Sequence, residues 1–259
     1  MISSNSALMQ HISKDDAAYL LDLVHSCTEC TSKEGLDEVA EGLKQLIPFE
    51  FFVSIYSAID GGGMGEPYHV ITANYPDEWV KLYVERKYHL VDSVLKENFS
   101  RFSIQYWADT YETNSTDNEF VSSAEDFGLC SGYTSGVRNL AGNRGGLFSF
   151  AGRKLEKSER SRAIIETVTP HLYQAVERIV QTDRLKKAPV LSEREKEVLK
   201  WVTYGKTTWE TSVILGIGER TVKFHLKNIM KKLNCVSRAH AAAIASELGI
   251  IEAERTQLI

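Results

Sequence analysis

The C-terminal part of the chain has helical periodicity throughout, and short breaks marked by glycine divide it. Over residues 191–249 no stretch shows the alternating pattern of a strand. The segment LSEREKEVLKWV places Ser192 three residues before Glu195, which is the pattern of a capping box. Gly205 ends this first helix, and the turn Gly216-Ile217-Gly218 separates the second helix from the third. These breaks leave only short helices, so the sequence predicts a small all-α unit.

The third helix of this unit, ERTVKFHLKNIMKKL over residues 219–233, has two different faces. Apolar side chains at helical spacing form one arc: Val222, Leu226, Ile229, Met230 and Leu233. Cations three and four residues apart form another arc, which polar and aromatic side chains border. Cations neutralise phosphates, and Thr, Asn, Lys and Arg can read base edges. The alternative is a solvated basic surface, but two short helices and a tight turn precede this helix, which favours DNA binding by a helix-turn-helix. The candidate DNA contacts are Arg220, Thr221, Lys223, Phe224, Lys227, Asn228 and Lys231.

The charge of the chain is distributed unevenly. From Lys186 onward there are 13 Lys and Arg against 8 Asp and Glu, whereas the preceding residues hold 17 against 27. A basic C-terminal unit behind an acidic body indicates two domains with different partners. A fourth helix, capped by Ser237, carries a face of small alanines. That face either packs on the other three helices or serves dimerisation.

The N-terminal part alternates helices with four or five strands, several of them joined by short turns. This order predicts an α+β fold, in which an N-terminal α/β/α sandwich around an antiparallel sheet precedes the all-α four-helix helix-turn-helix domain. The predicted domains are residues 1–181 and 191–259, with a linker over 182–190. We expect helices at 13–31, 35–46, 76–88, from Asp92, at 118–128 and 158–180, and strands at 50–59, 68–74, 133–140 and 146–151, with a glycine-rich loop at 60–67.

One stretch of the N-terminal part, YPDEWVKLYVERKYHLVDSVL, combines aromatic residues with a single acid. Tyr75, Trp79 and Tyr83 are four residues apart, so on a helix they would share one face. Asp92 lies between apolar neighbours, and a buried carboxylate is costly unless it is hydrogen-bonded. A small ligand that donates a hydrogen bond in an otherwise apolar cavity would relieve that cost. Alternatively Asp92 is a helix N-cap, and its two oxygens allow both roles.

Both parts of the chain resemble one family. Glu195, Leu199 and Gly205 match the pattern of the C-terminal domain of LuxR-type transcription regulators, as does GKTTWETSVILGIGERTVKFHLKNIMKKLN almost throughout. The spacing of the aromatic residues and Asp92, with Trp107 fifteen residues later, resembles the autoinducer-binding domain of the quorum-sensing members. Gly132 and Ser149 match further positions of that domain. The resemblance covers nearly the whole chain.

The resemblance implies an N-acyl-homoserine lactone as the signal ligand. Trp79 would then donate its indole N–H to the lactone carbonyl, and Asp92 would accept from the ligand amide. Tyr75 and Ser149 would hydrogen-bond the acyl carbonyl. The other two candidates would form the wall of the pocket around the ring and the chain: Tyr83 and Trp107.

Two positions depart from the family pattern. Ser93 directly follows Asp92 where the family usually has proline, and Ser135 similarly replaces a common proline. Loss of proline at a first helical turn changes the local entropy more than the chemistry of the pocket. The alternative function is therefore a LuxR-type regulator that responds to a different small molecule or acts without one.

Other classes of function are not expected. The aromatic and acidic cluster has no nearby histidine or second carboxylate for acid–base catalysis, so we expect no enzyme and no cofactor. Cys27 and Cys30 form a C-x-x-C without a second pair, and we interpret them as ordinary residues at a helix end. No apolar run approaches the ~20 residues that span a bilayer, and no secretory signal is present, which favours the cytoplasm and no membrane partner. The expected partners are operator DNA, the autoinducer, a second copy in a homodimer, and RNA polymerase.

Overall fold

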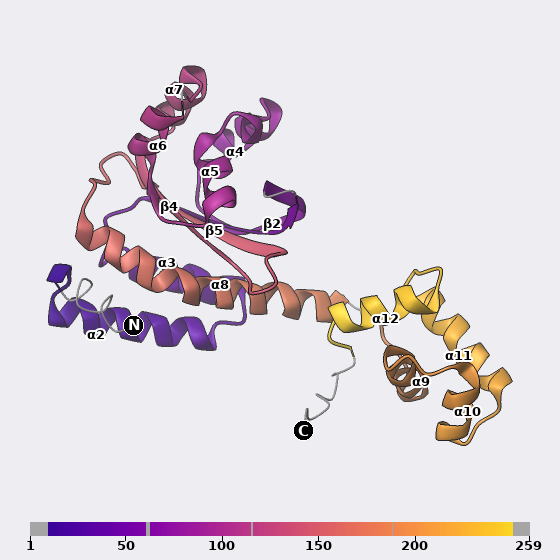
Figure 1. Ribbon diagram of the computed structural model, residues 1–259. Helices are drawn as coiled ribbons and strands as arrows, with labels where there is room; N and C mark the ends of the chain where they lie inside the picture. Colours follow the sequence, from indigo (N-terminus) through magenta and orange to yellow (C-terminus); the bar gives the residue numbers. More distant parts are fainter. Residues whose placement is uncertain (1–9, 61–62, 115, 188, 251–259) are drawn as a thin grey trace. The chain divides into compact units, whose positions relative to one another are not determined.

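The computed structural model of the protein describes residues 10–60, 63–114, 116–187 and 189–250. The chain divides into two compact units, Met1–Ile179 and Val180–Ile259. We call the first the cavity unit and the second the helical unit, and each is described by itself (Figure 1).

The cavity unit is built on one antiparallel sheet whose strand order is β2-β1-β5-β4-β3. Consecutive strands β1 and β2 pair directly, as do β4 and β5, while β5 returns to lie beside β1 at the centre of the sheet. The strands are β1 (Phe51–Asp60), β2 (Gly63–Ala73), β3 (Gln105–Tyr106), β4 (Ser131–Arg138) and β5 (Arg144–Gly152).

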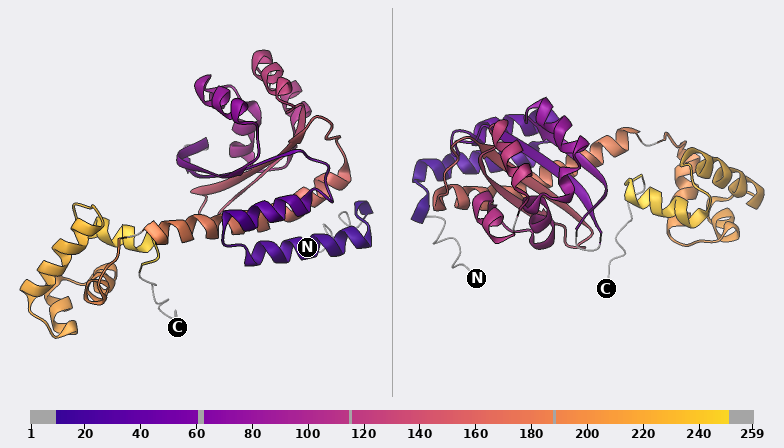
Figure 2. Two further views of the ribbon diagram at one scale, coloured as in Figure 1. Left: turned by 180° about the vertical axis from the view of Figure 1, so that it is seen from behind. Right: turned by 90° about the horizontal axis from the view of Figure 1, so that it is seen from above.

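Helices cover both faces of this sheet, so the predicted α/β/α sandwich is confirmed (Figures 1 and 2). One layer holds α2 (Lys14–Glu29), α3 (Lys33–Leu43) and α8 (Glu159–Lys187). The other layer holds α4 (Asp77–Glu85), the 3₁₀ turn η1 (Tyr88–Leu90), α5 (Ser93–Arg101), α6 (Trp107–Thr113) and α7 (Asn118–Asp126).

The two faces of the sheet carry different side chains, because neighbouring residues of a strand point to opposite sides. Tyr56 and Phe148 are buried, and Tyr56 stacks on Tyr173 of α8 with ring centroids 6.1 Å apart. Val53 and Leu147 belong to the opposite face, where they line a cavity under α4 to α7. The core on the α8 side is therefore filled, while the other side keeps an open space.

Several predicted boundaries in the cavity unit are wrong. Strand β2 already begins at Gly63, so the predicted loop at 60–67 is mostly strand, and its residues 61–62 lie outside the described residues. The helix predicted to reach Tyr88 ends at Glu85, because Lys87 adopts a left-handed conformation with φ of 53°. Pro76 is the N-cap of α4. The preceding Tyr75 therefore does not belong to the helix that carries Trp79 and Tyr83.

Helix α8 is longer than predicted and changes the description of the linker. The sequence predicts a helix that stops at Val180, yet α8 continues to Lys187. Residues 182–187 of the predicted linker are therefore helical. Clustered charges such as those in TDRLKK are compatible with an exposed helix. They were therefore not a sound reason to predict that the helix ends before them. Strand β3 and helix α6 were not predicted at all.

After the last residues of α8, the described part of the helical unit contains four helices, in the predicted order. They are α9 (Glu193–Thr203), α10 (Thr208–Leu215), α11 (Glu219–Lys232) and α12 (Arg238–Glu247). The predicted capping box at Ser192 and Glu195 is present, and Gly216 ends α10 with φ of 64°. The alanine face of α12 is explained by packing, because Ala241 and Ala245 are fully buried in the shared core.

Candidate functional site

A cavity of about 320 Å³ lies between the sheet and the helices of the second layer. Its lining is mainly apolar, with a group of polar side chains among the apolar ones. The structure brings together every ligand-site residue that the sequence predicted, although they come from five separate parts of the fold. Those residues are Tyr75, Trp79, Tyr83, Asp92, Trp107 and Ser149.

Asp92 is the N-cap of α5 and also faces the cavity. Its Oδ1 accepts the backbone N–H of Leu95 at 3.0 Å, and its Oδ2 accepts the hydroxyl of Tyr83 at 2.9 Å. Burial raises the pKa of Asp92, and the hydrogen bonds from Leu95 and Tyr83 offset this only in part. No Lys or Arg of the described residues forms an ion pair with it. The N-cap alternative is thus correct, and the hydrogen bonds and the charge of Lys96 together do not cancel the effect of burial on the pKa of this carboxyl.

Tyr83 does more than form a wall of the cavity, because its hydroxyl is the side-chain donor to Asp92. Trp79 is 4% exposed and packs in an aromatic cluster, with its ring centroid 5.8 Å from that of Tyr88. No described residue accepts a hydrogen bond from the indole N–H of Trp79. A polar donor is therefore available in an otherwise apolar wall.

A chain of hydrogen bonds links Trp107 to the floor of the cavity. Its indole N–H donates to Thr134 Oγ1 at 2.8 Å, and Thr134 Oγ1 lies 2.7 Å from Ser149 Oγ. The Ser149 hydroxyl in turn lies close enough to Tyr75 to lower the pKa of its hydroxyl, against the larger effect of burial. Burial raises the pKa of Tyr75, so this hydroxyl stays neutral and can donate. Trp107 lines the cavity, but because it donates to Thr134 its N–H is already used within the protein.

Gly132 makes room for this arrangement. A Cβ at Gly132 would lie 2.7 Å from both the Phe150 carbonyl and Trp107 Cε2, closer than such atoms approach. The glycine therefore lets the indole of Trp107 lie directly on strand β4. This gives a physical reason for the Gly132 match in the sequence.

Three polar residues at the site were missed by the sequence reasoning. One is His89 of η1, which lines the cavity, so the expectation that no histidine lies near the cluster was wrong. Tyr111 of α6 lines the cavity, and burial raises the pKa of its hydroxyl, with the Asp92 charge as the next contributor. Thr134 lies directly opposite Ser149 in the β4–β5 pairing and connects it to Trp107. The spacing of Trp107 and Tyr111 by one helical turn was a usable signal, but α6 itself was not predicted.

Ser93 has a partner of its own. Its side chain is 8% exposed, and its Oγ lies 2.5 Å from Oγ1 of Thr116, in the segment before α7. This contact connects the N-terminus of α5, which carries Asp92, to the helix that brings Phe120 to the cavity. The departure from proline thus adds a contact between two walls of the cavity.

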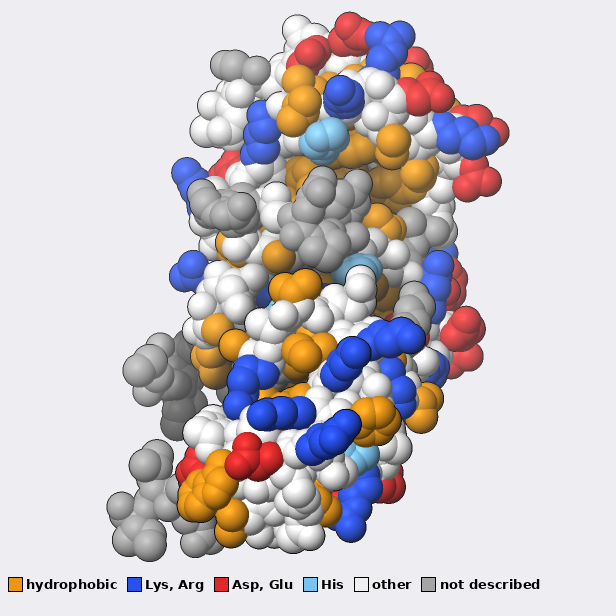
Figure 3. All heavy atoms as spheres, turned by 90° about the vertical axis from the view of Figure 1, so that its right-hand side faces the viewer, with side chains coloured by type: hydrophobic (Ala, Val, Ile, Leu, Met, Phe, Trp, Pro, Cys, Tyr) orange, Lys and Arg blue, Asp and Glu red, His pale blue; other side chains and the backbone are white. Residues whose placement is uncertain are grey.

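The second candidate site is the outer face of α11 in the helical unit. The predicted DNA contacts Arg220, Thr221, Lys223, Phe224, Lys227 and Lys231 are exposed, and Asn228 is half-buried. The opposite face supplies the core, with Val222 and Ile229 fully buried. Lys and Arg side chains gather on the face of the helical unit that Figure 3 shows. The helix is therefore held from one side and presents cations on the other.

Lys232 at the end of α11 has a different role from the exposed cations. Its Nζ donates to Glu195 Oε2 at 2.6 Å and to the carbonyl of Val190 at 3.2 Å. Glu195 is 4% exposed and also accepts the backbone N–H of Ser192 at 2.7 Å. The pair joins the end of α11 to the start of α9 and so fixes the orientation of the basic helix within the unit.

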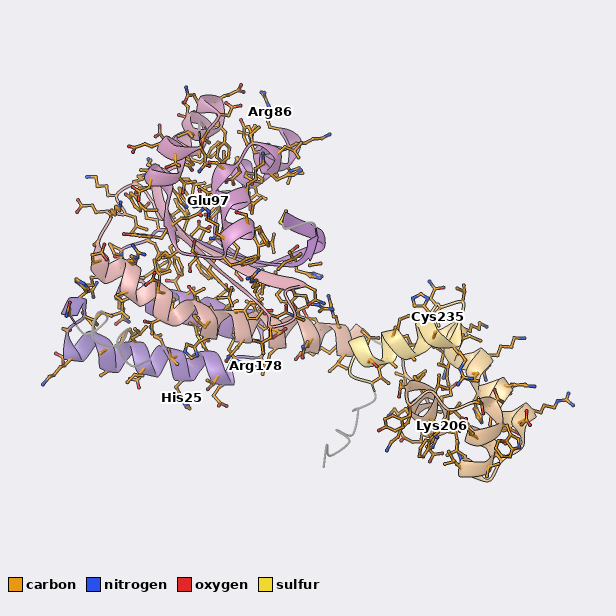
Figure 4. The ribbon with its side chains drawn as sticks, viewed as in Figure 1. His25, Arg86, Glu97, Arg178, Lys206 and Cys235 are labelled. Atoms are coloured by element: carbon orange, nitrogen blue, oxygen red, sulfur yellow. The ribbon has the colours of Figure 1, made fainter. Side chains whose placement is uncertain are left out.

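Cys27 and Cys30 lie at the C-terminal end of α2, as interpreted from the sequence. Both are buried, and burial raises the pKa of the Cys27 thiol to about 12. Arg178 of α8, labelled in Figure 4, donates to the backbone carbonyls of both cysteines. These contacts show that the two cysteines of the C-x-x-C are part of the packed interior of the cavity unit. Among the described residues, no group of His, Cys, Asp or Glu is arranged to hold a metal ion.

The described helices include none that is long and apolar enough to span a bilayer.

Comparison with known proteins agrees with this geometry. Residues 32–176 match the family described as autoinducer binding domain, and residues 189–250 match bacterial regulatory proteins, luxR family. The transcriptional activator protein VanR of Vibrio anguillarum is 30% identical over 86% of this chain and 93% of its own length. The protein y4qH of Sinorhizobium fredii is 38% identical over 69% of this chain, which spans 56% of that protein.

A solved structure has the same fold. SdiA in complex with octanoyl-rac-glycerol has a TM-score of 0.63 and 22% identity, and it covers 92% of this chain and 98% of its own. With both family matches in the predicted order, the chain belongs to the LuxR family of regulators, with an autoinducer-binding domain followed by a helix-turn-helix DNA-binding domain.

Proposed function

We propose that the protein binds an N-acyl-homoserine lactone in its cavity and thereby controls its binding to operator DNA through α11. The observation that carries the proposal is Asp92, a half-buried carboxylate that lines the cavity, whose pKa is raised by burial and which has no ion-pair partner among the described residues. A ligand amide N–H directed at Asp92 would supply a charge-assisted hydrogen bond in a dry site. Binding would then relieve the cost of burying this charge.

The other polar groups suit the rest of such a ligand. A lactone carbonyl would accept the indole N–H of Trp79, and an acyl carbonyl would accept from the Tyr75 and Ser149 pair. Tyr83 would hold Asp92 in place through its hydrogen bond of 2.9 Å. We add Tyr111 to the proposed ligand contacts, because its hydroxyl lies close enough to Asp92 for the charge of that carboxylate to raise its pKa.

The proposed partners follow from the helical unit and the family. Exposed Arg220, Lys223, Lys227 and Lys231 would contact phosphates, while Thr221, Phe224 and Asn228 would approach base edges. A homodimer would match the two-fold symmetry of a palindromic operator. RNA polymerase is a further proposed partner, because VanR is named a transcriptional activator. We place this binding protein, which we propose is not an enzyme, in the cytoplasm, where operator DNA is found.

A second candidate is regulation by a different acyl ligand. The support is chemical, because an apolar cavity with a few polar groups can also hold an acyl ester. Octanoyl-rac-glycerol, the ligand of the SdiA complex, is therefore the natural comparison compound. It offers hydroxyl groups where a lactone offers an amide N–H.

The ligand is tested by thermal unfolding of the full-length protein with N-acyl-homoserine lactones and with octanoyl-rac-glycerol. A ligand at 100 times its Kd stabilises the folded state by about 2.7 kcal/mol, which is a clear rise in Tm. We expect this rise with a lactone. A rise with the glycerol ester alone would favour the second candidate, and no rise with any of the compounds would reject both.

DNA binding is tested with Lys223→Ala and Lys227→Ala in the lactone-bound protein. Each should weaken operator binding. Each should also make the slope of log binding constant against log salt concentration less steep by about 1, because one phosphate contact is lost. Lys14→Ala, on α2 of the cavity unit, is the control and should leave the slope unchanged. Unaltered binding in both α11 variants would reject this helix as the DNA reader.

A further inference from the structure

The cavity opens to the surface through an apolar rim. Val70 of β2 and Val80 and Val84 of α4 line the cavity, yet they are 53%, 43% and 64% exposed. Figure 3 shows apolar side chains in a hollow on the side of the cavity unit that carries β2 and α4. Exposed valines that continue the lining of an apolar cavity indicate that a ligand can extend to this rim.

The sheet register shows how the polar part of the cavity is connected to the rim. Ser149 and Leu147 lie two residues apart on β5, and Leu147 pairs with Ile55 of the neighbouring β1. Ile55 in turn pairs with Val70 on the edge strand β2. All four side chains line the cavity. The route from Ser149 to the rim therefore runs diagonally over two strand spacings and is apolar after its first residue.

Strand geometry converts this route into a length. With ~4.8 Å between strands and ~3.3 Å per residue along a strand, the diagonal from Ser149 to Val70 is about 12 Å. A zigzag hydrocarbon with C–C bonds of ~1.52 Å advances roughly 1.3 Å per carbon, so about 12 Å corresponds to roughly nine carbons. A short acyl chain placed at Ser149 would end over Leu147 or Ile55 and leave the rim valines exposed.

We propose that this cavity is selective for long acyl chains, of about ten carbons or more, whose terminal carbons lie between Val70, Val80 and Val84. The inference rests on the proposed function, because it takes the amide and carbonyl groups to lie near Asp92, Tyr75 and Ser149. The rim valines then determine specificity for chain length, while the polar residues recognise the head of the ligand.

The chain length is also expected to set the affinity. Each methylene buried along the apolar route tightens Kd about fourfold. The gain should continue from N-butanoyl to N-decanoyl homoserine lactone and should stop once the chain passes the rim into water. Selectivity for long chains is therefore a consequence of how far the apolar lining extends.

The test is calorimetric titration of the full-length protein with N-butanoyl, N-octanoyl and N-dodecanoyl homoserine lactone. Val84→Asp places a charge on the rim, and Leu21→Asp on α2, 68% exposed in the wild type, is the matched control outside the cavity. We expect Val84→Asp to weaken dodecanoyl binding about tenfold and butanoyl binding hardly at all. The control should change neither Kd. Val84→Thr, which keeps the shape of the side chain, should give a smaller loss of the same selectivity.

The outcomes separate the two proposals. If the lactones bind but Kd is the same for all chain lengths, or if Val84→Asp weakens all of them equally, the inference on chain length is overturned and the lactone site stands. If no lactone binds at any length, the proposed function fails and this inference fails with it.

Discussion

Glu195 in the helical unit and Asp92 in the cavity unit are both carboxylates at the start of a helix, and burial acts to raise the pKa of each, but their surroundings differ. Glu195 completes the capping box of α9 and receives the ammonium of Lys232 at 2.6 Å. Burial alone would raise its pKa, but Lys232 and the hydrogen bonds from Ser192 outweigh burial and lower it. Asp92 receives one backbone N–H and one tyrosine hydroxyl, and its pKa remains raised.

The difference lies in where the polar groups find their partners: within the protein in the helical unit, and in part only in a ligand in the cavity unit. In the helical unit the carboxylate, its cation and the helix caps satisfy one another, so the basic helix is held without a ligand. In the cavity unit the polar groups around Asp92, Trp79 and Tyr111 face an open space. A ligand would complete this unit, which is how binding can shift the equilibrium between its states.

We expect the largest loss of stability when the carboxylate of Glu195, which has its partners within the protein, is removed. Glu195→Ala removes a helix-capping interaction and the partner of Lys232, and should destabilise the helical unit by about 2–3 kcal/mol. Hydrogen exchange of peptides from α9 and α11 in the full-length protein would measure the loss. Glu193→Ala, whose ion pair with Lys196 is exposed, is the control and should cost well under 1 kcal/mol. Equal exchange in the two variants would contradict the role of Glu195.

Asp92→Asn removes the charge from the other carboxylate while keeping a good N-cap residue for α5. We expect lactone affinity to fall about 10- to 100-fold, because a charge-assisted hydrogen bond is replaced by a neutral one. The Tm of the free protein should stay equal or rise, since a carboxylate whose burial is only partly offset is replaced by a neutral amide. Titration and thermal unfolding of the same variant measure both. A lower Tm with unchanged affinity would mean that Asp92 only caps the helix.

The two carboxylates should also give opposite pH dependence. The pKa of Asp92 is raised above 3.8, so its contribution to stability is full below that pH and is lost as the pH rises through the folded-state pKa. The pKa of Glu195 is lowered below 4.5, so its contribution is present above that pH and is lost as the pH falls through the folded-state pKa.

The contribution of Asp92 to the slope of the free energy of unfolding against pH can reach about 1.4 kcal/mol per pH unit, where the folded and unfolded states differ by one bound proton. Urea unfolding of the wild type and of Asp92→Asn from neutral to mildly acidic pH would measure it, with cavity-unit tryptophan fluorescence as the signal. The wild type should gain stability relative to the variant as the pH falls. A constant difference across this range would show that Asp92 is not perturbed.

Ser93 gives the smallest expected effect and tests the contact between two walls of the cavity. Ser93→Ala loses the hydrogen bond to Thr116 and should destabilise the cavity unit by about 1 kcal/mol. Ser93→Pro loses the same bond but gains a favourable first-turn proline, so its Tm should be nearly unchanged. Ser100→Ala, on the same helix, is the control. An unchanged Tm in Ser93→Ala would show that the contact contributes little.

Local signals in the chain were enough to predict most of the helical unit. Ser192, Thr207 and Ser237 cap their helices through backbone groups three residues away, and Gly216 ends α10 in the conformation that glycine favours. Such interactions involve neighbours in the sequence, so the pattern alone predicted the caps at Ser192 and Ser237 and the turn at Gly216, although the cap at Thr207 was not predicted. The spacing of Trp79 and Asp92 also indicated the identity of the ligand site, through its resemblance to a family.

What the sequence by itself determined is the set of polar groups available to each site and the helices of the DNA-binding unit. Tertiary structure decided which of these groups contact one another. Trp107 hydrogen-bonds Thr134, which is 27 residues away in the sequence, and Ser93 hydrogen-bonds Thr116, which is 23 residues away. Tertiary structure also decided the length of the cavity, because the pairing of Ile55 with Val70 and Leu147 sets the route to the rim. These contacts depend on strand register and burial, which arise only when distant segments pack together.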